Sequence, residues 1–162
     1  MLRLVFGATI LLAASGCATP PAIHSVKQPD VSQEQQRALL IGTWFGDAKT
    51  KDGGRRLQIT ERAPDGTYKV MFRIMEPSGR IWEQSEVGFW GASGGIYFTI
   101  TRGWLDGQDF SAANPTDASL NDAYQILELT NARFRYRALP SGNTYSLSRV
   151  ADSFEFPPQQ ND

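Results

Sequence analysis

Side chains that could do covalent chemistry are scarce in this sequence, which has a single cysteine and a single histidine. The letters Gly91-Ala92-Ser93-Gly94-Gly95 match the Gly-x-Ser-x-Gly pattern of a nucleophile elbow. That elbow requires a helix after the serine and a histidine that takes its proton. Here a strand pattern follows Ser93, and His24 lies far away in a proline-rich stretch. We therefore interpret the segment as a glycine-rich hairpin turn.

The carboxylates suggest no catalytic or metal site either. Glu83 and Glu86 fall on opposite faces of a strand, so they cannot easily converge on one substrate. Either the strand is solvated, or one of the two carboxylates pairs with an arginine inside a barrel. Four aspartates occur in or beside one long polar segment without the spacing of a calcium loop: Asp106, Asp109, Asp117 and Asp122. Clustered histidine or cysteine ligands are also missing from the sequence. We expect a protein without catalytic activity, metal or cofactor.

Three arginines share one face of a late strand pattern, where Arg133, Arg135 and Arg137 alternate with Phe134 and Tyr136. One interpretation is a solvent-facing row of charge that blocks aggregation. The other is a basic wall that faces an acidic ligand or partner. We favour the solvent-facing row.

The N-terminus has the pattern of an export signal. Arg3 supplies a positive charge, and residues 4–14 form an apolar run that is too short for a permanent membrane helix. The small residues Ser15 and Gly16 come directly before Cys17. One interpretation of this pattern is an ordinary secretory signal that happens to contain a cysteine.

The sequence Ala14-Ser15-Gly16-Cys17 resembles the lipobox of bacterial lipoproteins. The resemblance implies that residues 1–16 are removed and that Cys17 is lipidated, with acyl chains such as palmitate, and anchors the protein to a membrane. Ala18 follows the cysteine in place of aspartate, which in Gram-negative lipoproteins favours sorting to the outer membrane. We expect the protein there, facing the periplasm.

The overall charge excludes some partners. Lysine and arginine number 16 against 17 acidic residues, giving a net charge of −1. A nearly neutral chain has no electrostatic footprint for nucleic acid. With one cysteine, no internal disulfide can form, so the hydrophobic core must hold the domain together.

The chain divides into a tether, one domain and a tail. Residues 17–31 contain prolines and no periodicity, which is typical of an extended tether. Residues 32–41 have a helical pattern that Ser32 and Gln35 can begin as a capping box and Gly42 can end. We place a single domain at 32–156 and a tail at 157–162.

Beyond Gly42 the pattern alternates with the period of β-strands that have one face on a core. Short turn signals between successive runs favour an antiparallel meander. Eight strands are expected, at 43–49, 55–62, 67–75, 80–90, 95–103, 123–130, 132–138 and 143–150. Eight such strands can close into an up-and-down barrel whose interior is either filled or holds one small ligand. Residues 104–122 have no strand signal and form a long loop.

The start of the first strand carries a family signature. Gly42-Thr43-Trp44 resembles the Gly-x-Trp motif of lipocalins and related calycin barrels. In that family the tryptophan closes the barrel and packs against a basic residue from the last strand, for which Arg149 is the candidate. The middle motif and the C-terminal helix of full lipocalins are missing, so the resemblance implies a shorter lipocalin-like barrel. Alternatively, Trp44 is a core residue of another antiparallel sheet.

Two functions remain open for such a barrel. The first is a non-enzymatic protein that binds a small hydrophobic ligand inside the barrel. The second is a structural or assembly lipoprotein with a packed barrel that contacts another envelope protein. For the first, we expect these strand residues to line the interior: Tyr68, Val70, Phe72, Ile74, Ile96, Phe98 and Ile100. Phe134 is a further core candidate.

Three apolar residues in the long loop need a place away from water. We expect Trp104, Leu105 and Phe110 either to cover a ligand as a lid at the barrel mouth or to form a small satellite core.

Overall fold

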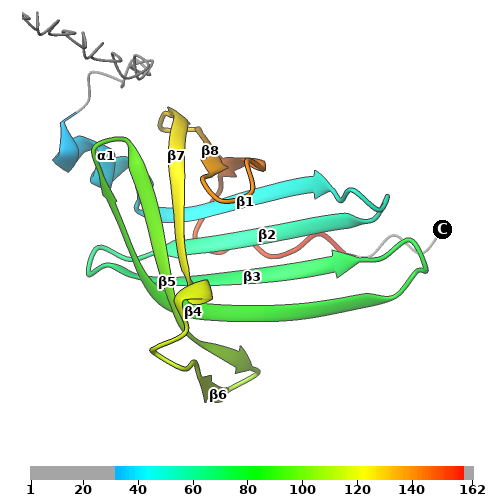
Figure 1. Ribbon diagram of the computed structural model, residues 1–162. Coiled ribbons are helices and arrows are strands. Elements are labelled where there is room, and N and C mark those ends of the chain that lie inside the picture. The colour runs from blue at the N-terminus through cyan, green and yellow to red at the C-terminus, as the bar shows by residue number, and fades with distance from the viewer. Residues whose placement is uncertain (1–31, 159–162) are drawn as a thin grey trace, which may run out of the picture.

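The computed structural model describes residues 32–158 as a closed antiparallel β-barrel with one helix at its start (Figure 1). Eight strands pair in the ring order β1-β2-β3-β4-β5-β7-β8-β9, and β9 returns to pair with β1. The expected all-β up-and-down barrel preceded by a short helix is therefore confirmed. The elements are α1 (Gln33–Leu40), β1 (Gly42–Lys49), β2 (Arg55–Arg62), β3 (Thr67–Met75), β4 (Ile81–Ser93), β5 (Ile96–Asp106), β6 (Asp109–Ala112), the 3₁₀ turn η1 (Ala118–Leu120), β7 (Asn121–Leu129), β8 (Arg133–Ala138) and β9 (Thr144–Arg149).

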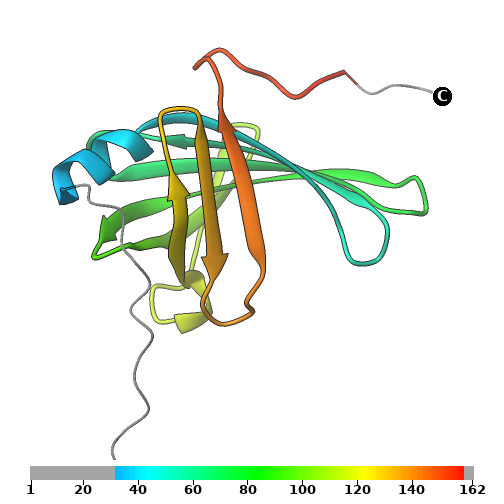
Figure 2. The ribbon, with the colours of Figure 1, turned by 90° about the horizontal axis from the view of Figure 1, so that it is seen from above.

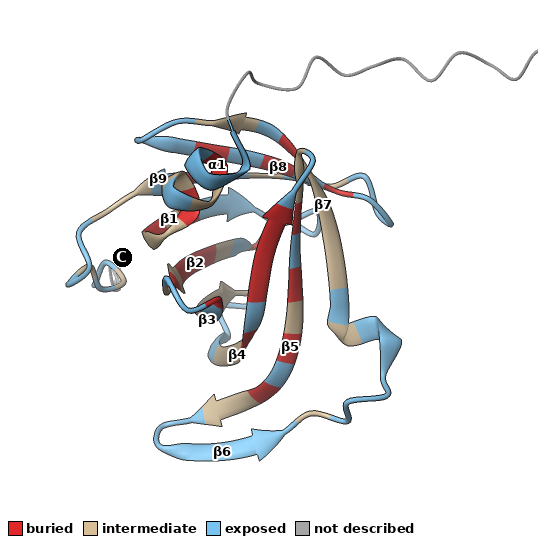
Figure 3. Ribbon diagram, turned by 90° about the vertical axis from the view of Figure 1, so that its left-hand side faces the viewer, coloured by how far each residue is buried: buried red, intermediate tan, exposed pale blue. Residues whose placement is uncertain are grey.

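The long loop expected at 104–122 is wrong in its first half. β5 continues to Asp106, turns at Gly107 and pairs with the short strand β6. All four residues of β6 are exposed, so they lack the buried-and-exposed alternation that reveals a strand. The β5–β6 hairpin projects away from the barrel wall (Figure 3).

The helix α1 begins with the expected capping box. The Ser32 hydroxyl accepts the Gln35 backbone N–H, and the Gln35 side chain accepts the Ser32 N–H. Gly42 follows the helix with a φ of 103°, a conformation that favours glycine. Among the described residues, no helix is long and apolar enough to cross a membrane.

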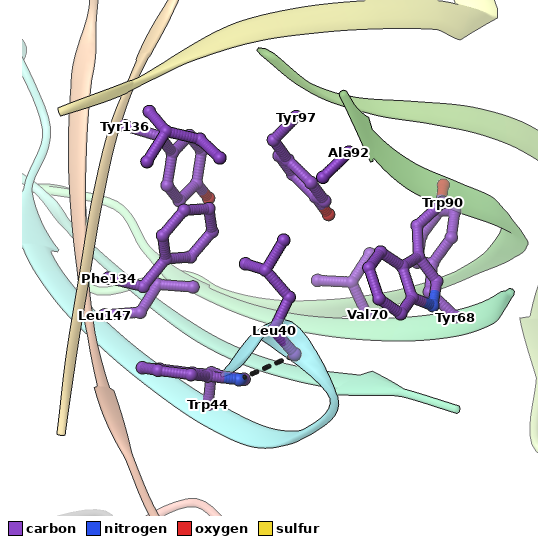
Figure 4. Close-up of a cluster of buried hydrophobic side chains, with 11 residues drawn as sticks. Leu40, Trp44, Tyr68, Val70, Trp90, Ala92, Tyr97, Phe134, Tyr136 and Leu147 are labelled. Atoms are coloured by element: carbon purple, nitrogen blue, oxygen red, sulfur yellow. Dashed lines mark hydrogen bonds between the residues drawn. The ribbon is translucent and has the colours of Figure 1, made fainter. Parts of the chain in front are cut away.

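One end of the barrel is closed by the helix and by a packed core. α1 lies against this end (Figure 3), and its Leu40 side chain is fully buried. Figure 4 shows Leu40 at the centre of the cluster, with Trp44 beside it. The Trp44 indole N–H donates to the Leu40 carbonyl at 3.0 Å, which ties β1 to the helix. We call this closed end the floor.

The C-terminal segment runs along the outside of the barrel (Figure 2). The Phe154 ring lies 4.9 Å from the Phe45 ring on the outer side of β1. Arg73 on β3 lies 4.7 Å from the Phe156 ring, and it donates to the Pro157 carbonyl at 2.9 Å. The segment therefore packs on β1 and β3 and contributes to the fold as far as residue 157.

Candidate functional site

A cavity of about 470 Å³ occupies the barrel interior away from the floor. It reaches the barrel end at which the β3–β4 and β8–β9 turns lie, because Trp82, Pro140 and Ser141 line it. We call this end the mouth. The volume lies within the range of small-molecule sites. The barrel is therefore hollow, whereas the assembly hypothesis required a fully packed barrel.

The inward-facing rows of β2 and β3 form one wall of the cavity. On β3 the structure brings together Tyr68, Val70, Phe72 and Ile74, the four residues predicted from this strand. The residues that alternate with them, such as Lys69 and Arg73, lie on the outer face of the strand. The neighbouring row on β2 is polar and was not predicted: it comprises Arg56, Gln58 and Thr60.

On β5 the prediction chose the wrong face. Ile96, Phe98 and Ile100 do not line the cavity, and Phe98 is 38% exposed on the outer side, where its ring lies over Gly91. The inward row of β5 is Tyr97, Thr99 and Thr101. The usual rule that the more apolar row faces the interior fails here, because this interior is a cavity with polar walls.

Three charged side chains line the cavity: Arg56, Glu86 and Asp122. The Arg56 guanidinium lies 5.0 Å from the ring centroids of both Phe72 and Tyr145. Burial, and secondarily the nearby Asp122, raises the pKa of the Glu86 carboxyl, while Arg56 opposes this shift. The lining therefore combines aromatic surface with charge, and it is not the uniformly apolar interior that we expected.

Tyrosine rings make up much of the remaining wall. Tyr97 stacks on Tyr124 at 5.5 Å, and Tyr136 stacks on Tyr145 at 5.2 Å. Burial raises the pKa of Tyr68 and of Tyr136 to about 12, so both hydroxyls stay protonated at neutral pH. The Tyr68 hydroxyl is also hydrogen-bonded to the Thr101 hydroxyl at 2.9 Å. This wall offers flat apolar surface with neutral hydrogen-bonding groups.

The structure brings together the three residues of the Gly-x-Trp signature at the floor. Trp44 is 0% exposed, and the Arg149 guanidinium lies 4.3 Å from its ring. Arg149 donates to three backbone carbonyls, those of Asn131, Ile41 and Leu39, at 2.7, 2.8 and 2.5 Å. A side chain on Gly42 would meet the Arg149 Nη1, so the glycine makes room for the guanidinium.

The three candidate lid residues do not cover the cavity. Trp104 and Leu105 belong to β5, Phe110 belongs to β6, and none of them lines the cavity. Phe110 is 56% exposed, with its ring over Gly103 in the same hairpin. The lid interpretation is therefore wrong for this structure, because the β5–β6 hairpin holds these residues where none of them lines the cavity.

The arginines of β8 face solvent. Arg133 and Arg135 lie 3.9 and 3.6 Å from the Glu128 carboxylate, and Arg137 donates to the Gln125 amide oxygen. The structure therefore places this row outside the cavity. The predicted lipidation site Cys17 lies outside the described residues. Within residues 32–158, no group of three or more histidine, cysteine or carboxylate residues could hold a metal ion.

Sequence reasoning missed most of the polar lining, including Arg56 and Asp122. Arg56 could have been found, since it continues the alternating row of Gln58 and Thr60 on a strand whose position was predicted correctly. Asp122 is the second residue of β7, which follows η1 directly, so no alternation precedes it and no comparable signal marks it.

Comparisons with known proteins add little. No family model matches the sequence, and no curated protein matches it. Among solved structures, a lipocalin-like protein from Bacteroides uniformis is similar, with 13% sequence identity and a TM-score of 0.42. The match covers 69% of this chain and 99% of that one. A likeness at this level says nothing about a ligand.

Proposed function

We propose that this protein binds a small ligand with a largely hydrophobic body inside its barrel and catalyses no reaction. The observation that carries the proposal is the cavity of about 470 Å³, whose walls combine aromatic, aliphatic and polar side chains and which reaches the mouth. The floor is packed, so a ligand enters at the mouth. The lining also contains hydrogen-bonding groups, which suit a ligand with a polar group at one end.

Binding of a neutral apolar fluorophore, N-phenylnaphthylamine, to the purified full chain tests the proposal. The variant Ala138→Trp enlarges a buried residue that lines the cavity, so it should weaken binding at least about tenfold. Phe98→Trp is the matched control, because Phe98 lies on the outer face. A wild-type protein that binds no probe, or equal binding in both variants, would contradict a ligand site in the barrel.

We further propose that the barrel is anchored to the bacterial outer membrane by lipid on Cys17 and faces the periplasm. The support is the sequence pattern alone: a positive charge, an apolar run and small residues before the single cysteine. Cys17→Ser should move the protein from the membrane fraction to the soluble fraction of cells. A variant that stays with the membrane as the wild type does would refute the anchor.

A further inference from the structure

Arg62, at the end of β2, is a buried arginine without a counterion. Its residue is 2% exposed, and neither Nη1 nor Nη2 has a hydrogen-bond partner among the described residues. Its Nε donates to the Tyr97 hydroxyl at 3.1 Å. The guanidinium lies 4.7 Å from the Tyr97 ring and 5.2 Å from the Phe134 ring. Ring faces attract a cation, but they leave the four N–H groups on its two terminal nitrogens without acceptors.

The contrast with Arg149 shows that this arrangement is unusual. Arg149 has three carbonyl acceptors for its guanidinium, and Asp152 contributes a nearby negative charge. The terminal nitrogens of Arg62 have no acceptor among the described residues, and its positive charge repels that of Arg149. A buried guanidinium with unused donors favours an anion, or at least oxygen acceptors, next to it.

Arg62 lies just beyond the inner end of the cavity. Along β2, Arg56, Gln58 and Thr60 line the cavity, and Arg62 is the next residue in the same inward row. Because β5 lies three strands further around the ring than β2, the bond to Tyr97 carries the guanidinium across the barrel interior. Tyr97 itself lines the cavity. The positive charge therefore lies between the floor and the space where a ligand would bind.

We infer that the inner end of the cavity receives an acidic group of the ligand, with Arg62 as its counter-charge. The ligand class is a monocarboxylic acid with an apolar body. Arg62 is not among the residues that line the cavity, so it acts through its positive charge and through its hydrogen bond to the hydroxyl of Tyr97, which does line the cavity. This inference rests on the proposed ligand-binding function and specifies the ligand's chemistry and orientation. The acid group points to the floor, and the apolar body contacts the aromatic walls.

The two carboxylates of the cavity belong to strands other than β2. Glu86 is on β4 and Asp122 is on β7, and Arg56 already offsets Glu86 electrostatically. These carboxylates repel an anion held near them, so they favour the orientation in which the acid group lies next to Arg62. Glu86→Gln should therefore strengthen the binding of an acid and leave a neutral alcohol unaffected.

The experiment compares phenylbutyric acid with phenylbutanol, which share a body and differ in the charged group. Isothermal titration calorimetry on the purified full chain, with a protein-free reference, measures both affinities at neutral pH. The wild type should bind the acid at least about tenfold more tightly than the alcohol. Arg62→Met should abolish that preference, and Arg62→Lys should retain part of it. Arg102→Met, an arginine on the outer face near Phe89, is the matched control and should change neither affinity.

The possible results separate this inference from the proposed function. If the wild type binds both compounds equally, the inference is wrong while the barrel remains a ligand site. If it binds neither, and N-phenylnaphthylamine also fails to bind, the proposed function itself is wrong. An acid preference that survives in Arg62→Met would show that Arg62 is not the counter-charge, and the inference would be wrong. Thermal unfolding checks that the variants fold, and the wild-type comparison stands even if Arg62→Met does not.

Discussion

The floor and the mouth of this barrel are built from the same strands, but the floor is closed and packed whereas the mouth is open. At the floor, Trp44 is 0% exposed, and Arg149 donates to three backbone carbonyls from two separate segments, the end of α1 and the β7–β8 turn. At the mouth, Trp82 is 37% exposed and lines an open cavity. Closure at one end by an indole, a guanidinium and a helix lets the other end remain hollow.

Arg62 lies at the boundary between these two regions and belongs fully to neither. It is buried like a floor residue, yet its terminal nitrogens lack the acceptors that the floor gives to Arg149. Burial alone therefore does not make a residue part of the packed core. Arg149, whose guanidinium has acceptors, closes the barrel, whereas Arg62, whose terminal nitrogens have none, is the residue to which we assign a role in binding.

The largest expected effect separates two tryptophans of the same barrel. Trp44→Ala removes a fully buried indole together with its bond to the Leu40 carbonyl, so it should lower the free energy of unfolding by about 3–5 kcal/mol. Trp82→Ala, at the mouth, should cost under about 1 kcal/mol. Urea denaturation of both variants measures the difference. Similar losses at the two sites would mean that the mouth is as important to folding as the floor.

The next effect concerns the pair at the floor. Arg149→Ala strips three carbonyls of their donor and should lower the free energy of unfolding by about 2–4 kcal/mol. In a double-mutant cycle with Trp44→Ala, the two losses should be non-additive by at least about 0.5 kcal/mol, because the guanidinium stacks on the indole. Strict additivity would show that the stacking contributes nothing.

A smaller effect comes from the cavity wall and depends on pH. Because burial raises the pKa of Glu86, the folded protein holds this proton more tightly than the unfolded chain does. Ionisation of Glu86 therefore lowers the free energy of unfolding as the pH rises from the ordinary pKa of a glutamate through the raised pKa of Glu86. Glu86→Gln should be more stable than the wild type above this window and equal to it below. Urea denaturation from about pH 4 to pH 8 measures the difference; a stability difference that does not change with pH would contradict the assignment.

How far the sequence predicts this molecule differs between the fold and the cavity. The alternation on β3 identified the inward row correctly, because only the outward row contains charged residues, Lys69 and Arg73. On β5 both rows contain residues suited to a strand, and choosing the more apolar row led to Phe98 in place of Tyr97. Hydrophobicity alone does not predict which residues face the interior when the walls of the cavity are polar.

The floor and the β5–β6 hairpin also differ in what could be predicted from the sequence. Arg149 could be named from the sequence, because the family signature supplied a partner for Trp44. Arg62 continues the same alternating row as Arg56, but only the structure shows that its terminal nitrogens are buried without acceptors, beside a hydrogen bond that crosses the barrel to Tyr97. The exposed strand β6 gave no periodic signal at all.

The central claim is that one end of the barrel is packed while the cavity at the other end binds the ligand. The most direct test is a two-dimensional amide NMR titration of the full chain with phenylbutyric acid. The account predicts shifts for residues whose side chains line the cavity, such as Val70, Thr99 and Ala138, and for Arg62. The amide signals of three residues on the outer face of β5 should not shift: Ile96, Phe98 and Ile100. Shifts confined to the outer face, or to the exposed β5–β6 hairpin, would contradict the account.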